Sequence, residues 1–191
     1  MDLQRRLILN AGVAAAAAAL TGTPANAAGA AQQPIPAATG KAGDFNFLAG
    51  SWKINHRRLK QSWVAAKDWD IFEGEATCWT VLAGAASMEE LRIPARGFSG
   101  LGIRLLDVNK HLWADYWVSG RDGVLTPPPM WGSFENGVGT FAADDLDDGH
   151  PIKARGIWDR ITPKSCRWYQ TASRDGGKTW EENWFMDWVR A

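Results

Sequence analysis

Two side chains with useful chemistry, His56 and Arg58, stand two positions apart in a segment that is predicted to form a β-strand, Trp52–Lys60. Side chains alternate along a strand, so His56 and Arg58 share one face with Trp52 and Ile54. A histidine can act as a general base or acid, and an arginine can hold an anion or a developing oxyanion. The pair is therefore a candidate ligand site, with a hydrogen-bonded core histidine as the alternative for His56.

Arg57 and Arg58 are adjacent, so a regular strand cannot turn both of them to solvent. An arginine that is buried needs a carboxylate partner. Glu73 and Glu75, on the next predicted strand, are the nearest candidates in the chain, and a ligand carboxylate or phenolate is the functional alternative.

A second candidate group lies on the predicted strand His111–Ser119. Asp115 stands between Trp113 and Trp117 on one face, which would form an aromatic box with a charged centre. Tyr116 is on the opposite face with small and apolar neighbours. Strand parity alone leaves open which of the two faces lines an interior.

Motifs for other reaction classes are missing from the sequence. There is no nucleophile elbow, phosphate-binding loop or dinucleotide fingerprint. The three histidines, His56, His111 and His150, lie in separate strands or turns without metal-ligand spacing. We predict no metal site and no cofactor.

The amino-acid composition limits the classes of binding partner that can be expected. The 191 residues carry 21 basic and 21 acidic side chains, so nothing indicates binding to nucleic acid or to an anionic membrane. The 12 tryptophans are spread over most of the predicted strands, and they predict either an interior lined with flat aromatic surfaces or a tryptophan-rich packed core. Cys78 and Cys166 could form a disulfide or remain two buried thiols.

The remainder of the chain reads as strands separated by short turns, after a helical turn at Asp44–Leu48 with Asp44 as its N-cap. A single antiparallel up-and-down β-barrel spanning 44–191 would leave no free strand edge. The strands predicted after Trp52–Lys60 are Trp69–Leu82, Ser87–Ile93, Phe98–Asp107, His111–Ser119, Gly132–Glu135, Gly137–Ala143, Pro151–Arg160, Ser165–Ser173 and Trp180–Arg190. The three prolines 127–129 predict a loop between two of them.

The N-terminus predicts export. Arg5 and Arg6 precede the apolar run Ala11–Leu20, and Ala25-Asn26-Ala27 fits the cleavage rule for a signal peptide at 1–27. The arginine pair resembles a twin-arginine signal, with a general secretory signal as the alternative. Residues 28–43 are rich in Ala, Pro and Gly and predict a flexible linker. We therefore expect a periplasmic or secreted protein without an integral membrane segment once the signal is removed.

The segment Phe47-Leu48-Ala49-Gly50-Ser51-Trp52 resembles the first strand of the calycins, the lipocalin-like closed β-barrels, and especially a group of uncharacterised bacterial members. The resemblance implies that Trp52 plugs the closed end and that Arg190, from the last strand, packs on its ring. It thereby implies that His56 and Arg58 face the interior. By the same parity, Trp188, Met186, Trp184 and Glu182 should face inward.

The nitrobindin branch of the calycins holds haem through a histidine late in the chain, whereas the last histidine here is His150 and the closing strands contain none. This departure argues against haem.

Three functions remain open. The first is a lipocalin-like protein that binds a small, partly apolar, aromatic ligand through His56, Arg58, Glu73, Glu75, Trp113, Asp115, Trp117, Glu182 and Trp184. The second is a cofactor-independent lyase, isomerase or hydrolase on a small aromatic substrate, with His56 as acid or base and Arg58 as oxyanion partner. The third is an envelope interaction protein with a tryptophan-rich core. The sequence does not name the ligand or the oligomeric state.

Overall fold

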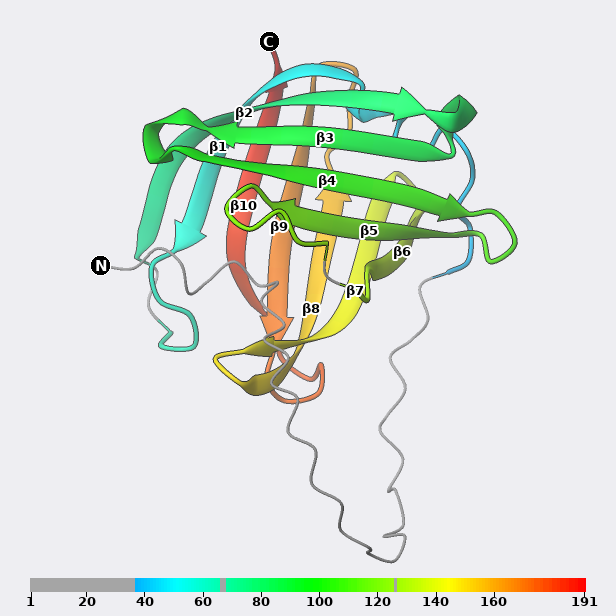
Figure 1. The fold of residues 1–191 in the computed structure, drawn as a ribbon. Helices are drawn as coiled ribbons and strands as arrows, with labels where there is room; N and C mark the ends of the chain where they lie inside the picture. The colour runs from blue at the N-terminus through cyan, green and yellow to red at the C-terminus, as the bar shows by residue number, and fades with distance from the viewer. Residues whose placement is uncertain (1–36, 66–67, 126) are drawn as a thin grey trace, which may run out of the picture.

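The computed structural model describes residues 37–65, 68–125 and 127–191, which form a closed antiparallel barrel (Figure 1). Each strand pairs with its neighbours in the chain, and the last closes on the first, so the predicted all-β up-and-down barrel is confirmed. The strands are β1 (Gly50–Leu59), β2 (Trp69–Val81), β3 (Ala86–Ile93), β4 (Phe98–Asp107), β5 (Leu112–Ser119), β6 (Met130–Glu135), β7 (Val138–Asp147), β8 (His150–Asp159), β9 (Ser165–Ser173) and β10 (Glu181–Arg190).

In the part of the chain that the structure describes, three short 3-10 turns accompany the strands: η2 (Asn46–Leu48), η3 (Leu82–Gly84) and η4 (Pro94–Arg96). The predicted helical turn before the first strand is η2, but its N-cap is Phe45 rather than Asp44. The Asp44 carboxylate instead accepts hydrogen bonds from the Lys41 backbone N–H and, at 3.1 Å, from the Trp113 indole. Asp44 therefore joins the turn to the barrel wall.

One end of the barrel is closed by aromatic side chains. Trp52, which is 1% exposed, donates its indole N–H to the Leu48 carbonyl at 2.7 Å. The Arg190 guanidinium lies 3.9 Å from the centre of the Trp52 ring and donates to the backbone carbonyls of Phe47 and Ala49. The predicted contact between Trp52 and Arg190 is confirmed.

The N-terminal segment that the structure describes lies against this end. The Gly40 N–H donates to the His111 carbonyl, and the Thr39 hydroxyl donates to the Phe134 carbonyl at 2.7 Å. Residues 37–43 of the predicted linker thus contact the barrel, whereas the predicted signal at 1–27 lies outside the described residues. Across the described part of the chain, no helix has the length and hydropathy needed to cross a bilayer.

A β-bulge in β10 changes the direction of its side chains. The register with β9 shifts between Glu182 and Trp184. Trp184, Met186 and Trp188 are buried as expected, but Glu182 is exposed and Asn183 is buried in its place. The expectation that Glu182 faces inward was therefore wrong, because parity cannot be carried across an inserted residue.

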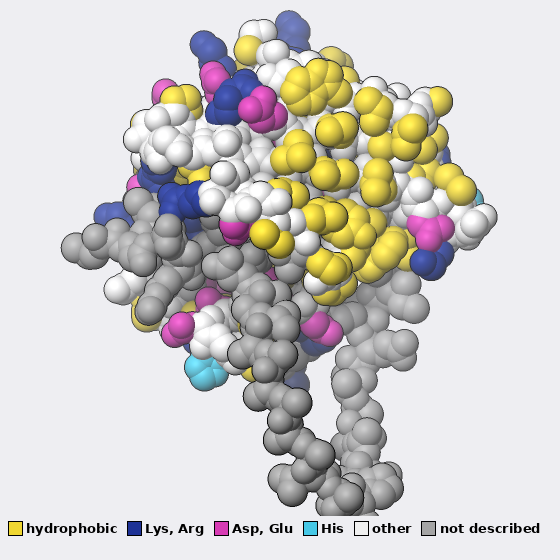
Figure 2. Space-filling view, in the orientation of Figure 1, with side chains coloured by type: hydrophobic (Ala, Val, Ile, Leu, Met, Phe, Trp, Pro, Cys, Tyr) yellow, Lys and Arg dark blue, Asp and Glu magenta, His cyan; other side chains and the backbone are white. Residues whose placement is uncertain are grey.

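The outer face of the barrel is apolar over part of its area. Figure 2 shows hydrophobic side chains gathered over β3, β4 and β5. Trp79 and Leu105 are 46% and 42% exposed. Cys78 and Cys166 are both buried and free, so the unbridged alternative is the correct one.

Candidate functional site

A partly open cavity of about 100 Å³ lies inside the barrel, bounded by strands β3–β6 and β8–β10. Its side walls include Tyr116 and Met130, where β5 and β6 pair over only three residue pairs, from Trp113 with Gly132 to Asp115 with Met130. Beyond that point Pro128 and Pro129 border the cavity. The cavity therefore lies beside the most weakly paired part of the barrel wall.

Tryptophans form much of the cavity lining: Trp117, Trp158, Trp168, Trp184 and Trp188. Glycines on the neighbouring strands make room for two of them. A Cβ atom on Gly100 would lie 2.1 Å from Cζ2 of Trp117, and one on Gly156 would lie 3.0 Å from Nε1 of Trp168. Of the sequence-predicted site residues, Asp115, Trp117 and Trp184 line this cavity.

Charged side chains meet at the cavity from three adjacent strands. Arg104 of β4 is 4% exposed, and its Nη2 lies 2.5 Å from Oε2 of Glu89 on β3. Its Nε lies 3.4 Å from Oδ1 of Asp115 on β5. The Arg104 guanidinium also lies 5.1 Å from the centre of the Phe45 ring in the closed end. Asp115 is thus the charged residue that β5 contributes to the cavity, and Tyr116 borders the cavity as well.

Burial sets the protonation of this group. Burial raises the pKa of Asp115 to about 6, Arg104 acts in the opposite direction, and Glu89 raises it further. Burial lowers the pKa of Arg104, but Asp115 and Glu89 together hold it above its usual value.

His56 lies behind the cavity wall and is not one of the lining residues. Its Nδ1 accepts the Trp184 indole N–H at 3.2 Å, so the hydrogen of the neutral ring is on Nε2. The ring stacks on Phe72 at 4.5 Å and 8°, and a Cβ on Gly74 would lie 2.6 Å from Nε2. The missing side chain at Gly74 makes room for this ring.

Burial, and secondarily Arg96, lower the pKa of His56 to about 3. His56 is therefore neutral near neutral pH, where a histidine with an unperturbed pKa titrates between about pH 5.5 and 7.5. Asp115 is the cavity residue whose pKa, about 6, lies in that range.

Arg58 lies at the other side of Trp184, with its guanidinium 4.8 Å from the ring centre. It borders a smaller hollow of about 20 Å³ together with Trp63, Gln170 and Asn183. The Gln170 amide donates to the Asn183 carbonyl oxygen at 3.0 Å. Since Gln170 also lines the main cavity, Arg58 lies next to the cavity rather than in it.

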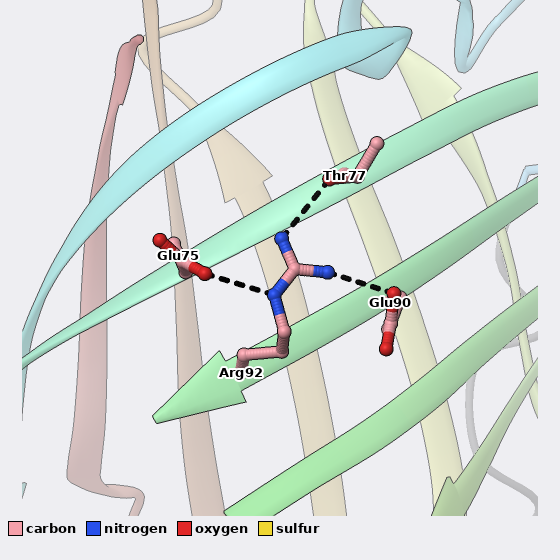
Figure 3. Close-up of polar contacts among 4 residues, drawn as sticks. All are labelled: Glu75, Thr77, Glu90 and Arg92. Atoms are coloured by element: carbon pink, nitrogen blue, oxygen red, sulfur yellow. Dashed lines mark hydrogen bonds and ion pairs between the residues drawn. The ribbon is translucent and has the colours of Figure 1, made fainter. Parts of the chain in front are cut away.

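The other sequence-predicted site residues lie elsewhere. Glu73 and Glu75 are exposed on β2. Glu75 accepts a hydrogen bond from Arg92, which also contacts Thr77 and Glu90 on the outer face of β2 and β3 (Figure 3). Trp113 is fully buried against Phe45 in the closed end, and Glu182 is exposed.

Sequence reasoning missed Glu89 and Arg104. A signal for Glu89 was present, because Glu89 and Glu90 are adjacent in a strand and only one of them can face solvent. Arg104 lies on the same face of β4 as Gly100 and Gly102. Glycines at alternate positions make room for large neighbours on this inner face. Among the described residues, no cluster of three or more His, Cys, Asp or Glu could hold a metal ion.

Comparison with known proteins gives little further information. No protein-family model matches the chain, and no curated protein matches it. A solved structure of a protein of unknown function from Nostoc punctiforme, of the DUF3598 family, is similar to 83% of this chain with a TM-score of 0.44 and 13% identity. The chain covers 53% of that protein. A similarity of this extent says nothing about the chemistry of the cavity.

Proposed function

We propose that this protein is an exported, lipocalin-like binding protein that holds a small, partly apolar aromatic ligand inside its barrel. The observation that carries the proposal is the cavity inside the barrel, with tryptophans on its walls and a buried charged group at one side. Small-molecule sites have this composition, in which apolar and aromatic walls supply contact area and a few polar groups fix orientation.

The size of the cavity limits the ligand. An apolar cavity of roughly 150 Å³ in another protein admits benzene. At about 100 Å³ this cavity is smaller, so a single-ring molecule would fill it and extend past its border at Pro128 and Pro129. A long lipid chain would require the walls to move.

Two measurements test the proposal. Native mass spectrometry of the protein taken from its own compartment should show a bound small molecule. Leu91→Phe, which places a larger side chain at the cavity wall, should abolish its retention, whereas Leu105→Phe on the outer face should retain it. A wild-type protein that carries no small molecule and binds no single-ring aromatic compound would refute the proposal.

Export is tested separately. The chain recovered from the periplasm or medium should begin at Ala28, as N-terminal sequencing would show. An intact Met1 terminus on the recovered protein would contradict the signal-peptide assignment.

A cofactor-independent enzyme remains the second candidate because of Asp115. A carboxyl group with a pKa of about 6 beside a guanidinium suits general acid–base work near neutral pH. If the protein is an enzyme, Asp115 would act as the acid or base and Arg104 as the oxyanion partner. These are the roles first considered for His56 and Arg58. Conversion of the co-purified molecule on incubation, lost in Asp115→Asn, would favour the enzyme; an unchanged molecule would favour the binder.

A further inference from the structure

The cavity has an excess of buried hydrogen-bond donors. Trp117, Trp158 and Trp188 line it, and the indole N–H of each is buried without an acceptor among the described residues. Arg104 adds Nη1, which is also buried without an acceptor. By contrast, the Trp184 indole donates to His56.

Such donors are unusual in a folded protein. Buried tryptophan N–H groups normally find a partner, because an unpaired donor loses the hydrogen bond it would make in water. Three of the unpaired donors belong to side chains that lie side by side. The Arg104 guanidinium is 5.3 Å from the centre of the Trp158 ring, and the Trp158 and Trp188 ring centres are 5.5 Å apart. Arg104, Trp158 and Trp188 therefore form one region of the cavity wall.

The charges nearby argue against an ionic ligand. Glu89 already pairs with Arg104 at 2.5 Å, and Asp115 lies 3.4 Å from it, so the group has no spare positive charge for an anion. A cation would be attracted by the carboxylates, but it would leave the indole and guanidinium donors unpaired and would approach them with its own positive charge. A neutral acceptor satisfies the donors and adds no charge.

We infer that the cavity selects a neutral single-ring aromatic compound bearing a carbonyl oxygen, which accepts hydrogen bonds from Arg104, Trp158 and Trp188. This inference rests on the proposed binding function and specifies the class of ligand. The aromatic ring lies among the tryptophan walls, and the carbonyl group lies toward Arg104.

The test uses four compounds of one shape with the full-length protein: acetophenone, isopropylbenzene, benzoate and benzamidine. Acetophenone should bind at least about tenfold more tightly than the other three, because one or two hydrogen bonds to buried donors distinguish it. In the ¹H–¹⁵N spectrum, acetophenone should shift the indole resonances of Trp158 and Trp188, whereas that of exposed Trp79 should not move.

Two matched variants test whether Trp158 contributes to the preference for a carbonyl-bearing ligand. Trp158→Phe removes one donor and keeps an aromatic ring, so it should reduce the preference for acetophenone over isopropylbenzene severalfold. Trp79→Phe, the same change on the outer face, should leave the preference unchanged.

Each outcome decides a different claim. Equal binding of isopropylbenzene and acetophenone would overturn the carbonyl inference and leave the proposed binding function intact. Tighter binding of benzoate or benzamidine would overturn it in favour of an ionic ligand. Binding of none of the four would overturn both claims and assign the cavity to water.

Discussion

Replacement of His56 by Gln should remove a defined part of the pH dependence of stability. The folded-state pKa of His56 is about 3, because of burial and then Arg96, against an ordinary value of 6.5. A histidine whose pKa is lowered by folding contributes full stability above pH 6.5 and loses it as the pH falls toward 3. The unfolded chain then binds a proton that the folded chain excludes.

The magnitude follows from the two pKa values. At about pH 7 both states are mostly neutral and the effect is roughly 0.2 kcal/mol. At about pH 5 the unfolded-state imidazole is protonated while the folded-state ring is neutral, which removes about 2 kcal/mol from the free energy of unfolding. The wild type should therefore lose about 2 kcal/mol more than His56→Gln between these two pH values.

Urea unfolding followed by tryptophan fluorescence at pH 7 and pH 5 measures this difference. His56→Gln should be less stable than the wild type at pH 7, by about 1–3 kcal/mol, because the imidazole stacks on Phe72 and accepts the Trp184 indole N–H. That deficit should shrink or reverse at pH 5. His150→Gln, at an exposed position, serves as the control. A deficit that stays the same within about 0.5 kcal/mol would refute the assignment of a neutral, buried His56.

Three further changes test the barrel and its cavity. Trp52→Ala should cost about 3–5 kcal/mol in chemical unfolding, as expected for a large buried aromatic, and a loss below about 1 kcal/mol would mean that Trp52 does not close the barrel. Gly100→Ala should displace Trp117, lower stability by about 1–3 kcal/mol and weaken acetophenone binding; an unchanged Trp117 indole resonance would contradict this. The raised pKa of Asp115 means that folding favours its protonated form, so stability is lost as the pH rises from 4 to 7; Asp115→Asn should gain about 2 kcal/mol relative to wild type over that range, and parallel pH profiles would contradict it.

The elements of the barrel could be predicted because they depend on local patterns. Phe98–Asp107 and Ser165–Ser173 have the predicted bounds, and most other strands differ by one to four residues at an end. Alternating apolar side chains and turn residues specify strands without knowledge of their partners. The contact between Trp52 and Arg190 was also predictable, although from resemblance to the calycins rather than from the residues alone.

Part of the candidate site was predictable at the level of side-chain direction. The inward directions of Trp117 and Trp184 agree with strand parity, whereas the choice between the Asp115 and Tyr116 faces stayed open in the sequence and both residues border the cavity. The inward direction predicted for Glu182 was wrong because a β-bulge reverses the alternation of side chains, and nothing local in the sequence marks that bulge.

The sequence by itself determined the strands, their turns and the chemical types available for the interior, because these depend on neighbours along the chain. Only the tertiary structure decided which of those side chains meet. His56 and Arg58 share a strand face, yet the Trp184 ring lies against both of them, and neither lines the cavity. Glu89, Arg104 and Asp115 come from three strands and form one charged group because the registers of β3, β4 and β5 bring them together. The register between strands depends on side-chain packing throughout the barrel, so it cannot be predicted from any short stretch of sequence.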